Sequence, residues 1–327
     1  MRHGRNLLAA LALGATAFVS AAEAQEWPTR PLVMVVPFAP GGPIDVLGRI
    51  VAQYLGEILG RQIVVENTTG AGGMTGTLRV AQSPPDGHMF VLGSIGTHAL
   101  NQTLYKKPLY NAATDFAPVA LIADIGLVLI TRKDLPPDNF KEFVAYAQAN
   151  QAKMQYGSGG AGTSQHIACV LLNKAIGVDV THIPYRGGGP ALADLVAGRL
   201  DYTCNYLSTA VPLIEANSVK AIATLTRERS TMFPALPTAD EQGLRDFDAY
   251  TWNAVFFPKG TPPAIVKKLN DALSAVMNLP AFRERVQSIG LLVAAPERRS
   301  PDYLQKFVVS EIEKWAAPIK ASGVVGD

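Results

Sequence analysis

Charged residues are scarce in this chain, and neither sign dominates. Only 17% of the 327 residues are charged, against 48% apolar ones, so the composition is that of a folded protein. The 29 basic and 27 acidic residues nearly balance, and no basic run interrupts that balance. This argues against a general nucleic-acid-binding protein. The chain is long enough for two domains with separate cores.

Cysteine is scarcer still, with only Cys169 and Cys204. Two cysteines are too few for a disulfide scaffold. An oxidising compartment would permit a bond between them. Two separate buried thiols fit the sequence equally well, because spacing along a chain gives no distance in space.

The signatures of several enzyme classes are missing. The sequence contains no G-x-x-x-x-G-K-[ST] phosphate loop, no G-x-S-x-G elbow and no H-E-x-x-H motif. His98, His166 and His182 lack the spacing of metal ligands. We therefore predict a protein without metal, cofactor or catalytic residue, which is not an enzyme.

The N-terminus has the pattern of a secretory signal peptide. A basic start precedes an apolar run over residues 7–19, and Ala22-Glu23-Ala24 forms a small-residue cleavage site. The run is too short to span a bilayer comfortably, and no later stretch is long and apolar enough to do so. We predict removal of residues 1–24 and export to the periplasm of a Gram-negative bacterium, as a protein not embedded in the membrane.

The most informative stretch begins with a short apolar strand at residues 33–36. Gly41 and Gly42 follow, and Pro43 suits the first position of a helix. Apolar residues then recur at three- and four-residue spacing as far as residue 59. A turn of this kind directs free N–H groups and the positive end of a helix at whatever lies above it, so it suits an anion.

The same order of strand, glycine-rich turn and helix recurs along the chain. Strands expected at residues 63–67 and 89–92 complete the first set, and residues 116–131 are expected to cross into a second, similar set. Such alternation predicts an α/β fold in which each lobe has a mainly parallel sheet flanked by helices. A strand at residues 249–257 should cross back. Clefts between lobes are common ligand sites, and crossing segments are natural hinges.

The lobe boundaries follow from these crossings. We expect one lobe to comprise residues 25–125 and 226–327, and the other residues 126–225.

One motif supports an alternative from another class. Gly157-Ser158-Gly159-Gly160-Ala161-Gly162 is a literal G-x-G-x-x-G between a predicted strand and a predicted helix, and Asp179 follows near the spacing of a ribose-binding acid. A dinucleotide-binding oxidoreductase is therefore the alternative reading. Export counts against it, and the hydroxyl groups of Thr163 and Ser164 add donors that suit a carboxylate.

Several polar residues near the turns have two interpretations each. Asp45 could orient the turn or accept from a ligand ammonium, or it could simply cap helix N–H groups. His166 could donate to an anion, or it could be a packed, hydrogen-bonded histidine. Asn205 lies at a predicted strand end, where it could face the cleft or belong to a turn. Phe38 and Trp252 could pack on a ligand or belong to the core.

These residues, in this order, resemble the solute-binding receptors of the tripartite tricarboxylate transporter family, known as Bug-type receptors. The resemblance covers essentially the whole mature chain. The segments that carry it are Pro37-Phe38-Ala39-Pro40-Gly41-Gly42 with Asp45, Glu66-Asn67, Gly70-Ala71-Gly72-Gly73 with Gly76, Pro85-Asp86-Gly87, Asp115-Phe116-Ala117-Pro118-Val119, Gly157-Ser158 through His166, Pro184-Tyr185-Arg186-Gly187 and residues 258–262.

The resemblance implies a type II periplasmic-binding-protein fold that closes on a small ligand, mostly a carboxylate in this family. One carboxylate is expected to be held by backbone and hydroxyl groups, with ordered waters, between the two lobes. The site residues implied here are Phe38, Ala39, Gly41, Gly42, Asp45, Thr97, Ser158, Gly159, Thr163, Ser164, His166, Arg186, Gly187 and Asn205.

One departure bears on the ligand. Many relatives have an aspartate where this chain has Asn205, so the resemblance favours a plain carboxylic acid, aliphatic or aromatic, over an amino acid. The implied role is that of a monomeric receptor that delivers a dicarboxylate or aromatic carboxylate to the membrane components of a tripartite transporter. An exported enzyme or a sensor subunit would use the same cleft and stays the alternative.

Overall fold

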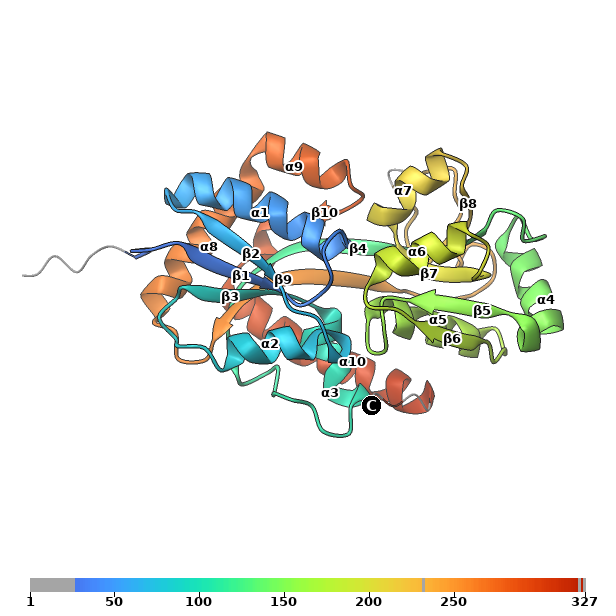
Figure 1. Ribbon diagram of the computed structural model, residues 1–327, viewed down its shortest axis with the longest axis horizontal. Coiled ribbons are helices and arrows are strands. Elements are labelled where there is room, and N and C mark those ends of the chain that lie inside the picture. The colour runs from blue at the N-terminus through green and yellow to red at the C-terminus, as the bar shows by residue number, and fades with distance from the viewer. Residues whose placement is uncertain (1–26, 231–232, 323–324, 326–327) are drawn as a thin grey trace, which may run out of the picture.

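The structure, a computed structural model, describes residues 27–230, 233–322 and 325 of the chain. The predicted signal peptide lies outside the described residues. Figure 1 shows two lobes side by side, each with a sheet covered by helices. The predicted two-lobed α/β fold is confirmed.

The first lobe is built from both ends of the chain. Its N-terminal strands and helices are β1 (Leu32–Val36), α1 (Pro43–Leu59), β2 (Ile63–Asn67), α2 (Met74–Ala81), β3 (Met89–Ser94) and α3 (Asn101–Leu104). Short helical turns at Ala71–Gly73 and Gly96–Leu100 precede α2 and α3. The C-terminal elements are α8 (Pro263–Asn278), α9 (Pro280–Gln287), β10 (Leu292–Val293) and α10 (Pro301–Ser322).

The second lobe repeats the order of strand, turn and helix. Its elements are α4 (Phe140–Asn150), β5 (Gln155–Ser158), α5 (Ser164–Ala175), β6 (Thr181–Pro184), α6 (Gly188–Val196), β7 (Tyr202–Tyr206), α7 (Leu207–Glu215) and β8 (Val219–Thr224). The strands predicted at residues 33–36, 63–67, 89–92, 116–131 and 249–257 are present, with bounds shifted by a few residues.

Two strands join the lobes, as the two predicted crossings require. They are β4 (Phe116–Arg132) and β9 (Tyr250–Pro258). The first half of β4 pairs with β9 and β10, and its second half pairs with β7 and β8. These pairings are all antiparallel, whereas β2, β1 and β3 pair in parallel, as do β6, β5 and β7. The sheets are therefore parallel where strands alternate with helices and antiparallel along the crossings.

Gly48 faces the sheet and lets the first helix pack closely on it. A Cβ built at Gly48 would lie 3.0 Å from Cγ2 of Val36 in β1. Leu47, Val51 and Leu55 on the same helix are fully buried against the sheet. This packing sets the direction of α1, whose N-terminus follows the end of β1 after the turn of residues 37–42 (Figure 1).

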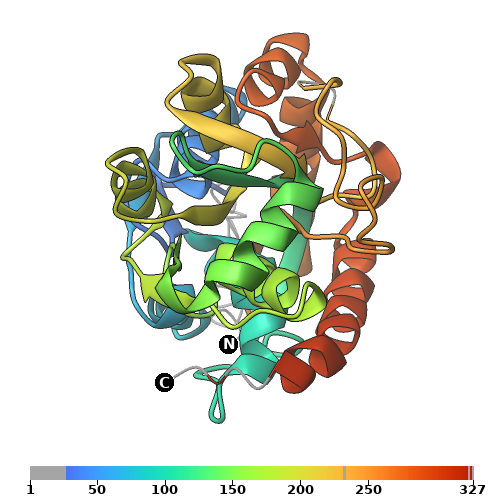
Figure 2. The same cartoon turned by 90° about the vertical axis from the view of Figure 1, so that its right-hand side faces the viewer.

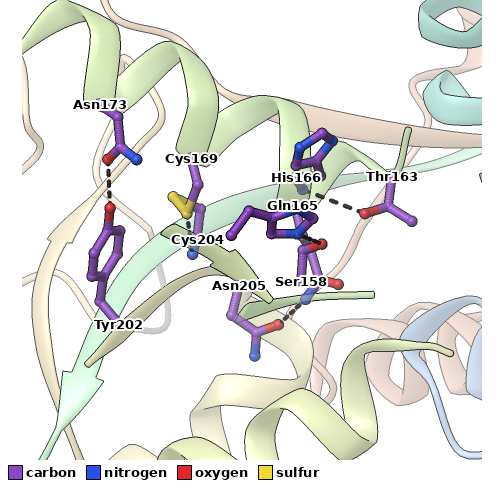
Figure 3. The surroundings of a disulfide bond; sticks show 10 residues. Ser158, Thr163, Gln165, His166, Cys169, Asn173, Tyr202, Cys204 and Asn205 are labelled. Carbon is purple, nitrogen blue, oxygen red and sulfur yellow. Dashed lines mark hydrogen bonds between the residues drawn. A yellow bond between two sulfur atoms is a disulfide. The ribbon is translucent and has the colours of Figure 1, made fainter. Parts of the chain in front are cut away.

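Cys169 of α5 and Cys204 of β7 form a disulfide, with their Cα atoms 5.4 Å apart. Both residues are fully buried, and the bond ties the helix to the strand beside it (Figure 3). The sequence alone does not distinguish this disulfide from two free thiols. Separately, none of the described helices combines the length and apolar character that crossing a bilayer requires.

Candidate functional site

Four turns from the two lobes, those after β1, β2, β5 and β6, meet at two adjoining cavities. We call the larger the outer cavity, which has a volume of about 560 Å³ and includes exposed walls at Gly70, Ala71 and Arg186. The smaller, the inner pocket, has a volume of about 20 Å³ and buried walls at Ile44 and Gln165 among others. Both are lined by Phe38 and Ala39 from the first lobe and by Gly159 and Gly187 from the second.

The inner pocket lies at the N-termini of three helices. Gly42, Thr163 and Gly187 are the N-cap residues of α1, α5 and α6, and all three line this pocket. Gly42 and Gly187 make no side-chain cap, because glycine has no side chain. The first N–H groups of a helix lack partners within it, and its N-terminus is partly positive. Three such ends directed at one space form a site for an anion.

Asp45 organises the first of these turns. Its carboxylate accepts from the N–H of Gly41 at 2.9 Å, from Arg49 at 3.0 Å and from the amide of Asn67 at 2.9 Å. Burial by itself would raise the pKa of Asp45, but these donors outweigh it and lower the pKa. Asp45 is 3% exposed and lines neither cavity, so its contacts are those of a residue that orients the turn.

The turn between β5 and α5 is supported from beneath by side chains. The hydroxyl of Ser158 accepts from the N–H of Gly160 at 3.1 Å and is bonded to Nε2 of His182 at 2.7 Å. The N–H of Gly159 donates to Oε1 of Gln165 at 3.0 Å, and Nε2 of Gln165 donates to Oδ1 of Asn205. Figure 3 shows Ser158, Gln165 and Asn205 of this group near the disulfide.

His166 is a packed, hydrogen-bonded residue. Its Nδ1 accepts from the N–H of Gly162 at 3.2 Å, and its ring stacks on that of His182 with centroids 4.2 Å apart. Burial, together with the neighbouring His182, lowers the pKa of His166 to about 3. The ring is therefore neutral at neutral pH and supplies no positive charge to an anion.

Two further candidates are also occupied by protein groups. The hydroxyl of Thr97 accepts from the N–H of Ser94 at 3.0 Å and lies 2.9 Å from Nδ1 of His98. The hydroxyl of Ser164 lies 3.2 Å from that of Tyr206 and donates to Thr251 at 3.1 Å. These contacts hold the loops in place, and neither residue lines a cavity.

The predicted site residues thus divide into two groups. Those that line one or both cavities are Phe38, Ala39, Gly42, Gly159, Thr163, Arg186 and Gly187. Those that line neither cavity are Gly41, which is exposed, and the buried residues Asp45, Thr97, Ser158, Ser164, His166 and Asn205, which lie behind this wall. Trp252, weighed as a ligand contact, is fully buried and bonded to Glu311, so it belongs to the core.

Sequence reasoning missed several wall residues. They are Thr69, Gly70, Gly72, Gly73, Tyr105, Gln165, Tyr185 and Tyr206. The glycine turn after β2 ends a parallel strand, and that position alone could have placed it in the site. Gln165 had no such signal, because nothing in the sequence distinguishes it from its neighbours in the first turn of α5.

The lobes touch across the cleft at glycines. A Cβ built at Gly72 would lie 2.8 Å from the carbonyl oxygen of Ala161, and one at Gly96 would lie 3.2 Å from that of Gly162. Gly72 and Gly96 belong to the first lobe, whereas Ala161 and Gly162 belong to the second. The structure is therefore a closed arrangement in which backbone meets backbone.

The geometry contradicts the dinucleotide interpretation of Gly157–Gly162. Ser158 at the end of β5 pairs with Pro184, whereas Gln155 at its start pairs with Thr181. Asp179 precedes β6 and thus lies near the opposite end of these parallel strands from the glycine turn. A ribose-binding acid must lie at the same end as the turn. In addition, no three His, Cys, Asp or Glu residues in the described part of the chain are placed to hold a metal ion.

Comparisons with known proteins agree with this architecture. A family model described as "Tripartite tricarboxylate transporter family receptor" matches residues 47–324. The chain is similar to MatC (Rpa3494) from Rhodopseudomonas palustris with bound malate, at 39% identity and a TM-score of 0.86, covering 89% of this chain and 99% of that one.

Two other solved structures are similar over nearly their whole length. The periplasmic binding protein BugD is 37% identical with a TM-score of 0.88, over 92% of this chain and 100% of that one. The R. palustris protein Rpa4515 with adipate is 34% identical with a TM-score of 0.87, over 91% and 99%.

Proposed function

We propose that this chain, which belongs to the family of tripartite tricarboxylate transporter receptors, is a periplasmic receptor that captures a small organic carboxylate and delivers it to a membrane transporter. The observation that carries the proposal is the meeting of three helix N-termini at the cavities between the lobes. A carboxylate there would accept hydrogen bonds from free backbone N–H groups, which no side chain caps at α1 and α6, whereas Thr163 caps one N–H of α5.

The sizes of the two cavities support capture through water. A cavity needs about 10–15 Å³ on this scale to hold one water molecule, so the inner pocket of about 20 Å³ has room for one water and not for a ligand. The outer cavity, at about 560 Å³, falls in the range of small-molecule sites. The ligand body would lie in the outer cavity, with its carboxylate bridged by water to the helix ends.

Capture would be coupled to closure of the lobes. Both cavities have walls from each lobe, so a ligand makes its full set of contacts only when the lobes are together. A ligand that binds the closed form more tightly shifts the population toward it. The crossing strands β4 and β9 would act as the hinge, and the membrane partner would recognise the closed form.

The solved relatives favour a carboxylate over other anions, because MatC was solved with malate and Rpa4515 with adipate. We assign no catalytic role, since the side chains behind the wall are occupied with one another. Removal of a signal peptide at residues 1–24 would place the receptor in the periplasm.

The test combines native mass spectrometry of the purified protein with a thermal-shift panel of carboxylic acids. A ligand at a hundred times its Kd should stabilise the protein by about 2.7 kcal/mol. Recovery of the ligand unchanged supports a receptor, and turnover would contradict the proposal. Deletion of the gene should abolish uptake of the bound acid. Unchanged uptake would contradict the transport role and favour a sensor.

A further inference from the structure

Arg186 brings a positive charge to the cleft between the lobes. Among the described residues, it is the one charged side chain that lines either cavity, and no carboxylate lines them. Arg186 precedes Gly187, the N-cap of α6, so it lies at the rim of the outer cavity and is exposed. The cleft therefore carries a positive charge in addition to the helix ends.

Two carboxylates on the helices that begin at this cleft, Asp194 of α6 and Asp45 of α1, are already engaged. On α6, Asp194 accepts from the hydroxyl of Tyr185 at 2.6 Å and from Arg199 at 2.7 Å. In the facing turn of the first lobe, Asp45 is held by Arg49 and other donors. Within residues 27–230 and 233–322, no ion-pair partner of Arg186 is present. Its guanidinium is therefore available to an anion in the outer cavity.

The polar side chains at the inner pocket carry no charge. Gln165 lines the inner pocket, and its amide is shared between Gly159 and Asn205. The amide of Asn205 in turn donates to the hydroxyl of Thr209 at 3.1 Å. These bonds use the amide oxygens that could have accepted from a ligand ammonium. An ammonium group in this cleft would lose water without gaining a carboxylate partner.

We propose that Arg186 determines specificity by binding a second carboxylate at the far end of the ligand, so that the receptor selects an elongated dianion without an ammonium group. This assignment rests on the proposed function. One carboxylate is bridged to the helix ends by the water of the inner pocket. The carbon chain fills the outer cavity beside Phe38 and Tyr105, and the second carboxylate meets the guanidinium. Arginine suits this role because its planar fork binds a carboxylate through two parallel hydrogen bonds.

The experiment compares two matched series by isothermal titration calorimetry. Straight-chain α,ω-dicarboxylates of four to eight carbons are titrated beside the monocarboxylates of equal length, and 2-aminoadipate beside adipate. The proteins are the wild type, Arg186→Gln and Arg186→Lys. Arg245→Gln is the control, since Arg245 is also exposed and lines neither cavity.

We expect the best diacid to bind wild-type protein about tenfold more tightly than its monoacid, a gain suited to a charge-assisted bond at an exposed site. Arg186→Gln should remove that gain and leave monoacid affinity within about twofold, with Arg186→Lys intermediate. The control Arg245→Gln should change neither the diacid advantage nor the affinity for monoacids. Adipate should also bind more tightly than 2-aminoadipate.

Three results would overturn the assignment. They are a diacid advantage that survives Arg186→Gln, equal weakening of monoacids and diacids by that substitution, and 2-aminoadipate binding as tightly as adipate. Each of these leaves carboxylate binding intact and so leaves the proposed function standing. If no member of either series binds the wild-type protein, the proposed function itself fails.

Discussion

Ala39 and Gly187 face each other across the cleft, one from each lobe. A Cβ built at Gly187 would lie 3.2 Å from Cβ of Ala39, and both residues line the outer cavity and the inner pocket. This pair thus forms a shared wall between the two spaces, and it closes only because both side chains are minimal. The wall between the two cavities therefore forms only when the lobes close.

Enlarging Ala39 should therefore weaken ligand binding without unfolding the protein. Ala39→Leu places three more carbons against Gly187 and makes the closed form less favourable. A loss of about 1.4 kcal/mol in that form lowers affinity tenfold, and we expect at least this in calorimetric titration. The control is Gly189→Ala, where a Cβ meets nothing within 4 Å. Equal affinities for wild type and Ala39→Leu would show that the lobes do not meet here when ligand is bound.

The turn after β1 should depend on the charge of Asp45. Asp45→Asn keeps the size of the side chain but removes the anion that Arg49 and the N–H of Gly41 contact. We expect a loss of about 1–2 kcal/mol in the free energy of unfolding, measured by urea denaturation, because charge-assisted bonds at a buried group are lost. Glu57→Gln on the same helix is exposed and should change stability by less than about 0.5 kcal/mol. Equal effects of the two substitutions would refute the organising role.

Buried histidines should make the protein lose stability in mild acid. Burial lowers the pKa of His98 to about 3, and burial with His182 lowers that of His166 to about 3. In the unfolded chain a histidine titrates near 6.5, so the unfolded state binds more protons below that pH. The free energy of unfolding is therefore highest above about pH 6.5. Below that it decreases as the pH decreases, by up to about 1.4 kcal/mol per pH unit for each histidine.

Urea denaturation at pH 7, 6 and 5 measures that slope. His98→Gln should flatten it by about one histidine's share, because His98 is fully buried against Phe256 with ring centroids 3.9 Å apart. Substitution of the half-buried residue His182 is a weaker test, because solvent screens part of the shift in its pKa. An unchanged slope in His98→Gln would mean that His98 is protonated, or exposed, in the folded protein.

The disulfide should stabilise the second lobe and the site together. Cys169 lies one helical turn from Gln165, and Cys204 precedes Asn205, so the bond lies next to the Gln165–Asn205 pair (Figure 3). The bond closes a loop with a sequence separation of 35, and removing it in Cys169→Ala/Cys204→Ala should cost about 3–4 kcal/mol. Thermal unfolding of the wild type should shift down in dithiothreitol, and that of the double variant should not. A wild-type melting temperature indifferent to reductant would contradict this.

A third cavity, behind the hinge, offers a test of closure from the other side. It has a volume of about 800 Å³ and spans both lobes, with Leu207 and Thr224 on one side and Leu292 on the other. Successive residues of β9 point to opposite faces: Thr251 contacts Ser164 near the cleft, and Tyr250 lines the back cavity. Figure 2 shows α1 (blue) on the left and the segment before β9 (orange) on the right, on opposite sides of the molecule.

The hinge strands β4 and β9 lie between the ligand cleft and this back cavity, so closing the cleft should widen the back cavity. Leu292 is 56% exposed at the edge of this cavity, so Leu292→Trp adds bulk that the open form accommodates less well. We expect tighter ligand binding, by about three- to tenfold, in calorimetric titration. Val309→Trp on α10 is a control away from every cavity described here. Weaker binding in Leu292→Trp would place the hinge axis elsewhere.

Much of the architecture was predictable because it depends on local rules. Apolar periodicity located the strands and helices, and glycine and proline placed the turns at strand ends, including the α1 turn at Gly41 and Gly42. Chain order then implied two lobes with two crossings. The positive helix ends at the candidate site follow from the same local pattern, since a helix presents free N–H groups wherever it begins.

The partners of polar side chains were decided only by the tertiary structure. Asp45, His166 and Asn205 each had two roles open in the sequence, and each proved to be bonded to other protein groups. The disulfide, the antiparallel pairing of β4 and β9 and the place of Asp179 likewise depend on distances between segments remote in the chain. Periodicity records whether a residue is buried, but a hydrogen bond depends on direction and on which group arrives from elsewhere, and only folding brings those groups together.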